Sequence, residues 1–132
     1  ADMKQAAAWY QLSADKGYAP AQYRLASMYE KGNGVDHDLA KAKQYYQLAA
    51  EQGNASAMHN LAVLYASGTA GSQDYDSAAS WFSRAADLGV SDSQFNLAIL
   101  YARGNGVKQD LQESYKWFAI AAKSGDTKSP TP

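Results

Sequence analysis

The 132-residue chain has a formal net charge of −1, so it lacks the basic excess that marks a nucleic-acid-binding surface. It is 46% hydrophobic, which excludes a disordered polymer, and its apolar runs are too short to span a bilayer. The absence of cysteine excludes disulfides, thiolate metal sites and cysteine nucleophiles. The length is that of one domain able to bury a hydrophobic core.

A repeat of 36 residues runs through the chain and is clearest in its glycines, Gly17, Gly53, Gly89 and Gly125. Other residue types keep the same spacing: Leu25, Leu61 and Leu97; Ala26, Ala62 and Ala98; Tyr29, Tyr65 and Tyr101; and Gly32, Gly68 and Gly104. Aromatic pairs at 9–10, 45–46, 81–82 and 117–118 are also in register. A period of this length predicts a repeat architecture.

In chain order, a leading helix over about residues 2–16 is followed by pairs of helices. The first helix of each pair carries apolar residues at helical spacing, as over 92–103, and ends at the glycine of position 32, 68 or 104. Ser91 and Gln94 have the pattern of a capping box, and Pro20 suits a first helical turn.

The second helix of each pair is expected to begin at Asp38, Asp74 or Asp110, because aspartate caps a helix start and favours its dipole. It should run through the aromatic pair and stop at the glycine of the 36-residue period, so the last helix is predicted over about 110–124.

A pair of amphipathic helices cannot bury its own apolar face, whereas a stack of pairs buries a continuous core. The sequence therefore predicts an all-α fold, an α-solenoid of antiparallel helix pairs whose aromatic pairs fill the wedge between repeats. We expect a leading half-repeat at 1–17, full repeats at 21–53, 57–89 and 93–125, and a disordered tail at 126–132.

The repeat units resemble Sel1-like repeats, which are related to tetratricopeptide repeats. The first full unit reads AQYRLASMYEKGNGVDHDLAKAKQYYQLAAEQG and the third SQFNLAILYARGNGVKQDLQESYKWFAIAAKSG. The departures are alanine in place of the family glycine beside the repeated leucine, and a middle loop, SGTAGSQD, without Gly-Val. The resemblance implies a right-handed superhelix and a non-catalytic adaptor, without a cofactor, that holds a protein or peptide partner.

A weaker resemblance, carried by DSQFNLAILYARGNGVKQDLQESYKWFAIAAKSGD, is to the repeat region of PodJ-type polar localisation factors of bacteria. It implies a bacterial signalling, envelope or polar-localisation protein in the periplasm, with the cytoplasm as the alternative. Both ends lack the polar cap that solenoids need. We therefore expect either a fragment of a larger protein or a homodimer that stacks end to end.

By analogy with tetratricopeptide repeats, the first helices are expected to line the concave face and bind the partner. The predicted partner-binding residues are Tyr23, Arg24, Ser27, Lys31, His59, Asn60, Val63, Phe95, Asn96, Ile99 and Arg103. Among them, the rings of Tyr23, His59 and Phe95 form a ladder that suits a peptide groove. Two alternatives stay open: these side chains pack within the solenoid, or the chain is a structural spacer whose concave face binds nothing.

The stretch KGNGVDHD at residues 31–38 allows three interpretations: a phosphate-binding loop, a metal site with His37 between two aspartates, or a turn. It recurs as RGNGVKQD 72 residues later, which a helical repeat requires and a phosphate loop does not. The turn is therefore favoured. Glutamines replace His37 in the other copies, so we expect it to be exposed and unconstrained.

No catalytic motif accompanies the two histidines, His37 and His59, so an enzyme is only the second hypothesis. The middle loop carries Gly71 where the other copies have valine. We expect that loop to be the least well anchored of the three.

Overall fold

The computed structural model describes residues 2–128, and within them the side chains of residues 2–125. The described part consists of seven α-helices and contains no strand. The helices are α1 (Met3–Asp15), α2 (Ala19–Lys31), α3 (Leu39–Glu51), α4 (Ala55–Ser67), α5 (Tyr75–Asp87), α6 (Ser91–Arg103) and α7 (Leu111–Lys128).

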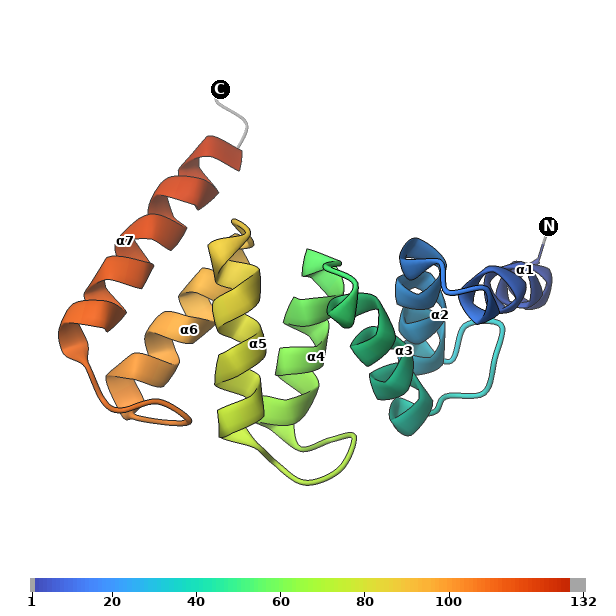
Figure 1. Cartoon of the computed structure of the whole chain (residues 1–132), viewed down its shortest axis with the longest axis horizontal. Helices are drawn as coiled ribbons and strands as arrows, with labels where there is room; N and C mark the ends of the chain where they lie inside the picture. Colours follow the sequence, from blue (N-terminus) through green and yellow to red (C-terminus); the bar gives the residue numbers. More distant parts are fainter. Residues whose placement is uncertain (1, 129–132) are drawn as a thin grey trace.

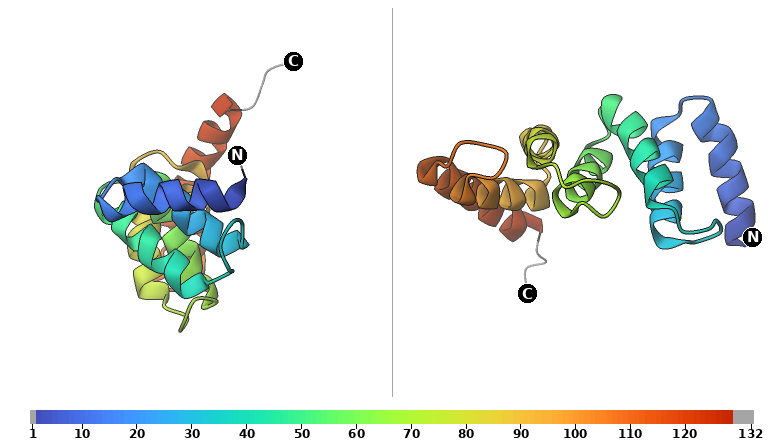
Figure 2. Two further views of the ribbon diagram at one scale, coloured as in Figure 1. Left: turned by 90° about the vertical axis from the view of Figure 1, so that its right-hand side faces the viewer. Right: turned by 90° about the horizontal axis from the view of Figure 1, so that it is seen from below.

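The helices form an elongated stack with α1 and α7 at its two ends (Figures 1 and 2). The main contacts join helices that are consecutive in the chain, from the α1–α2 pair to the α6–α7 pair. Such nearest-neighbour packing defines an α-solenoid. The predicted all-α solenoid of repeats is confirmed.

Most helix ends lie where the repeated residues predict them. The carboxylates of Asp38 and Asp74 each accept a bond from the backbone N–H three residues later, and Asp110 accepts from two backbone N–H groups. The first helices end at glycines 32, 68 and 104 in the left-handed conformation, with φ of 71°, 72° and 71°. Pro20 lies in the first turn of α2. These caps set the limits of each helix pair.

The predicted capping box of α6 does not form. Ser91 is already helical, and the N-cap is Val90, whose side chain cannot accept a hydrogen bond. The Gln94 side chain is buried and donates instead to the Ala86 carbonyl oxygen at the end of α5, 3.1 Å away. The buried carbonyl of Ala86 needs a hydrogen-bond donor, and the Gln94 amide supplies it.

The last helix is longer than predicted. It passes through Gly125 to Lys128, so residues 126–128 are helical rather than part of a disordered tail. The equivalent glycines 17, 53 and 89 take positive φ and turn the chain into the next helix, whereas Gly125 keeps a helical conformation. No further helix follows in the described residues to pack against such a turn. The remaining tail residues, 129–132, lie outside the described part.

The core consists of small residues between the helices and one aromatic of each central pair. Ala26, Ala62 and Ala98 have no exposed surface. Tyr46 and Phe82, the second members of their pairs, are buried, whereas their partners Tyr45 and Trp81 are half-buried. The expected aromatic wedge is therefore formed mainly by the second residue of the pair. Trp9, from the leading pair, is exposed.

Two loops are held by a close backbone approach at glycine. A Cβ atom at Gly34 would overlap the carbonyl oxygen of Met3, and one at Gly106 would overlap that of Tyr75. The middle loop has Ala70 at the equivalent position. Its base is nevertheless closed like the others, because the backbone N–H of Asp74 donates to the Tyr65 carbonyl oxygen at 2.9 Å. Weaker anchoring of this loop than of the other two stays a prediction.

We expect Gly106→Ala to lower the free energy of unfolding by more than Gly89→Ala, as measured by urea denaturation. Both glycines have positive φ, 74° and 91°, so each alanine costs roughly 1–2 kcal/mol in backbone strain. Only at Gly106 would the new Cβ also meet backbone, which adds about 1–3 kcal/mol. Equal losses at the two positions would show that the loop does not depend on this close approach.

Candidate functional site

The predicted partner-binding residues all lie on the first helices α2, α4 and α6, but they do not form one site. They form three groups: rings that pack on another aromatic residue, residues that line a pocket between α4, α5 and α6, and residues that line a pocket between α1 and α2. Asn60 is half-buried and lies beside the Tyr46 hydroxyl.

The three rings each pack on the second aromatic residue of their own repeat. The ring centroids are 5.8 Å apart for Tyr23 and Tyr46, 5.6 Å for His59 and Phe82, and 5.3 Å for Phe95 and Phe118. Tilted and edge contacts at these distances stabilise the fold. Tyr23 and His59 are half-buried, so the alternative in which these side chains pack within the solenoid describes them. Phe95 also contacts a ring but keeps 51% of its surface exposed.

His59 also joins two repeats. Its Nδ1 lies 2.6 Å from the hydroxyl of Ser93, which is buried on α6. Burial lowers the pKa of His59 below its usual value, and the nearby carboxylate of Asp92 opposes that shift only in part. The ring is therefore uncharged at neutral pH and acts as a polar contact between α4 and α6.

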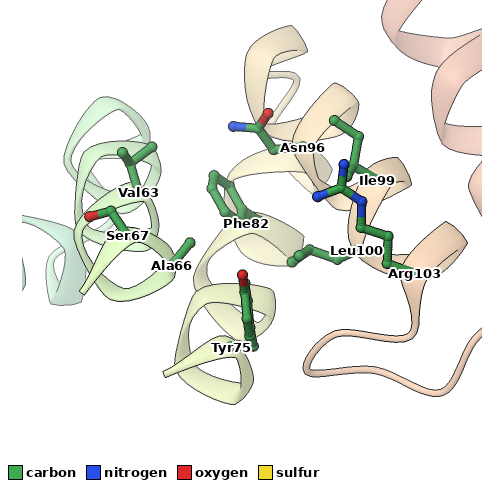
Figure 3. A pocket seen from close by; sticks show the side chains of 9 residues that line it. All are labelled: Val63, Ala66, Ser67, Tyr75, Phe82, Asn96, Ile99, Leu100 and Arg103. Atoms are coloured by element: carbon green, nitrogen blue, oxygen red, sulfur yellow. The ribbon is translucent and has the colours of Figure 1, made fainter. Parts of the chain in front are cut away.

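A pocket of about 300 Å³ opens between α4, α5 and α6 (Figure 3). Its lining residues are Val63, Ala66, Ser67, Tyr75, Phe82, Asn96, Ile99, Leu100 and Arg103. Four of the predicted residues, Val63, Asn96, Ile99 and Arg103, meet there. The floor is apolar, and the polar groups available to a ligand are a hydroxyl, an amide, a phenol and a guanidinium.

At this place the second repeat lacks two groups that the first repeat has, and the third repeat, with Ala102 and Phe118, lacks them as well. In the first repeat the Tyr46 hydroxyl donates to the Glu30 carboxylate at 2.6 Å. Burial, and then the neighbouring carboxylate, raise the pKa of Tyr46 well above its usual range, so the hydroxyl keeps its proton. The equivalent residues 36 positions later are Ala66 and Phe82, which bring neither carboxylate nor hydroxyl.

The α5 residues Tyr75 and Phe82 were not among the predicted site residues, because the repeat pattern assigned the second helices to the core. The signal that could have found them is the change from Glu30 to Ala66, which removes a side chain above the aromatic residue.

Arg24, Ser27 and Lys31 lie apart from this pocket. They line a smaller one of about 170 Å³ against α1, together with Met3, Tyr10, Met28 and Asn33. The structure therefore does not join the predicted residues of α2 to those of α4 and α6 in a single pocket.

The glycine-containing loop at residues 31–38 is a turn whose histidine has a structural contact. His37 Nδ1 lies 2.9 Å from the Glu30 carbonyl oxygen, as the side chains of Gln73 and Gln109 contact the equivalent carbonyls at 2.8 and 2.9 Å. The expectation of an unconstrained side chain is wrong, because a ring N–H and an amide N–H can both satisfy this last-turn carbonyl. Within the described residues, no three acidic or histidine side chains group as a metal site.

Helix pairs that stack mainly on their neighbours in the chain define a helical-repeat solenoid. The Sel1 repeat family matches residues 1–18, 19–54, 55–90 and 91–126, and the chain belongs to this family. Sel1 repeats are typically protein–protein interaction modules. A comparison with curated proteins gives no match.

Three solved structures with the same fold come from bacteria. The chain is similar to a Sel1 repeat protein from Oxalobacter formigenes, with 33% identity and a TM-score of 0.90 over 95% of this chain and 51% of that one. It is also similar to c5321, a protective antigen of uropathogenic Escherichia coli with an SLR fold, with 35% identity and a TM-score of 0.91 over 94% of this chain. The chain thus spans about half (51%) of the first protein and 27% of the second.

Helicobacter pylori cysteine rich protein B shares the fold at 23% identity, with a TM-score of 0.68 over 87% of this chain and 89% of that one. Among residues 2–128, no helix is both long and apolar enough to cross a membrane.

We expect the free energy of unfolding to fall as the pH drops from about 7.5 to about 5.5, in part through His59. Its pKa is lowered on folding from the ordinary value of 6.5, so the unfolded chain binds more protons in this range and stability rises with pH. Chemical denaturation across this range checks the slope. His59→Gln should reduce this slope, and an unchanged slope in that variant would show that His59 does not contribute to it.

Proposed function

We propose that this chain is a non-catalytic scaffold that binds a peptide or protein partner along the surface formed by α2, α4 and α6. The observation that carries the proposal is the pocket between α4 and α6, with an apolar floor and a polar rim that has no acidic or histidine side chain. Apolar pockets with a few polar groups are typical binding sites for anchor side chains. A rim without a carboxylate or an imidazole offers no general base, which favours binding over catalysis.

The ladder of rings takes a different role in this proposal from the one that the sequence alone suggests. Tyr23 and His59 hold the first helices on the second helices, so substituting them would affect stability as well as binding. Val63, which is exposed, and Asn96, which is half-buried at the pocket, are the residues that test binding with the least damage to the core.

We expect the immobilised double variant Val63→Ala/Asn96→Ala to capture at most roughly a tenth of the amount of partner protein that the immobilised wild type captures. The reason is that an anchor contact is worth about 1–2 kcal/mol. Quantitative mass spectrometry of captured proteins measures this, with Ser80→Ala/Lys123→Ala at exposed positions as the matched control. Thermal melting verifies that both variants are folded. Equal capture by all three proteins would mean that the partner does not use this surface.

Self-association is a second candidate, favoured by apolar side chains on the terminal helices. Trp9 and Leu12 on α1 are 71% and 58% exposed, and Leu111 and Tyr115 on α7 are 67% and 77% exposed. Each of these helices packs mainly on one neighbour. Either a further repeat of a longer polypeptide or a second copy of the chain could cover these faces, and a homodimer through the ends is the version that we propose.

Sedimentation velocity over a range of concentrations should show a monomer–dimer equilibrium that Trp9→Glu/Tyr115→Glu shifts to monomer, because charges are costly in an apolar interface. Ser80→Glu, which adds a charge at an exposed position of α5, is the control. A wild type that stays monomeric up to high concentration would contradict the homodimer.

The compartment that we propose is the bacterial periplasm, in a signalling, envelope or polar-localisation assembly. The support is the resemblance of residues 92–126 to polar localisation factors. Fractionation of cells that express the full-length protein distinguishes this location from the cytoplasm.

A further inference from the structure

We propose that the pocket between α4, α5 and α6 binds a glutamate or aspartate side chain of a partner peptide, next to an apolar residue, with Arg103 as its charged contact. This inference rests on the proposed function, because it names the chemistry that the same surface recognises.

The first repeat shows that this place in the solenoid accommodates a carboxylate. There Glu30 extends from the first helix, and its Oε1 accepts a bond from the Tyr46 hydroxyl at 2.6 Å. In the second repeat Ala66 replaces the glutamate, Phe82 replaces the tyrosine, and an open pocket of about 300 Å³ remains. A glutamate from a partner can therefore fill the volume that Glu30 fills within the chain.

The charge of the pocket is complementary to an acidic ligand. Arg103 is exposed and has no carboxylate within ion-pair distance among the described side chains, where the single ion pair joins Lys116 and Glu113. The lining contains no acidic residue, so an incoming carboxylate meets no like charge. A guanidinium can donate two parallel bonds to it, and the Asn96 amide is a further polar group on the same helix (Figure 3).

The apolar lining of the pocket accounts for the apolar residue that we propose next to the acidic one in the partner peptide. Val63, Phe82, Ile99 and Leu100 come from three different helices and surround the space between them (Figure 3). They can contact the methylene groups of a glutamate and one neighbouring apolar side chain. The volume lies at the lower end of the range of ligand pockets, roughly 300–1,000 Å³, which suits one or two side chains rather than a folded surface.

Selection of random phage-displayed peptides on the wild-type chain tests the inference, with affinities of the enriched sequences measured by fluorescence polarisation. We expect the enriched peptides to carry an acidic residue beside an aliphatic or aromatic one. Replacing that acid with its amide, or Arg103 with glutamine, should weaken binding roughly tenfold or more, because a charge-assisted bond is lost. Added salt should weaken binding as well.

A second variant fills the pocket from within. Ala66→Glu/Phe82→Tyr transfers the Glu30–Tyr46 pair of the first repeat to the second and should abolish peptide binding while thermal melting shows a folded solenoid. Lys123→Gln removes an equal charge at an exposed position of α7 outside the pocket and should leave the affinity unchanged.

Enriched peptides that lack an acidic residue, or that bind Arg103→Gln as tightly as wild type, would show that the inference is wrong. If such peptides still lose affinity for Val63→Ala/Asn96→Ala, the proposed function stands without it. A selection that enriches no peptide also overturns the inference, and the capture experiment then decides the proposed function alone.

Discussion

The close approach of neighbouring helices at buried alanines is the constraint on which the rest of the structure depends. Ala26, Ala62 and Ala98 have no exposed surface, so a larger side chain at any of them would push helices apart. Because each helix packs mainly on its neighbours in the chain, no distant element could compensate for that displacement. The spacing that these alanines set also brings one ring of each first helix to within 5.3–5.8 Å of an aromatic ring on its second helix.

Within this fixed spacing, the repeats differ at pairs of positions that change together. In the first repeat the Gln22 side chain accepts a hydrogen bond from Gln52, and in the third Gln94 accepts one from Ser124. The middle repeat has two apolar residues at the equivalent positions, Met58 and Leu88. A buried polar group needs a partner, so replacing both members is tolerated where replacing one is not. The described residues accordingly contain no buried side-chain nitrogen or oxygen without a hydrogen-bond partner.

The 36-residue period was sufficient to predict the helix pairs, their aspartate and glycine caps and the solenoid, because each of these depends on local chemistry that every copy repeats. The features that it did not predict depend on neighbours. Gln94 caps the preceding helix rather than its own, and Gly125 stays helical where no described helix follows. The pocket likewise escaped prediction, since no motif marks it and its lining side chains come from three helices.

A repeat protein can place a specific site only where one copy departs from the others without disturbing the shared packing. Among the described helices only the second repeat combines an alanine in place of Glu30 with a first helix that follows it, since the third repeat has Ala102 but ends at α7. The change from glutamate to Ala66 removes a side chain and leaves the ring contact between His59 and Phe82 in place. His59 carries no charge at neutral pH, since burial lowers its pKa. Arg103 is then the one formal charge among the residues that line the pocket, and in the proposed function its sign determines which partners the surface selects.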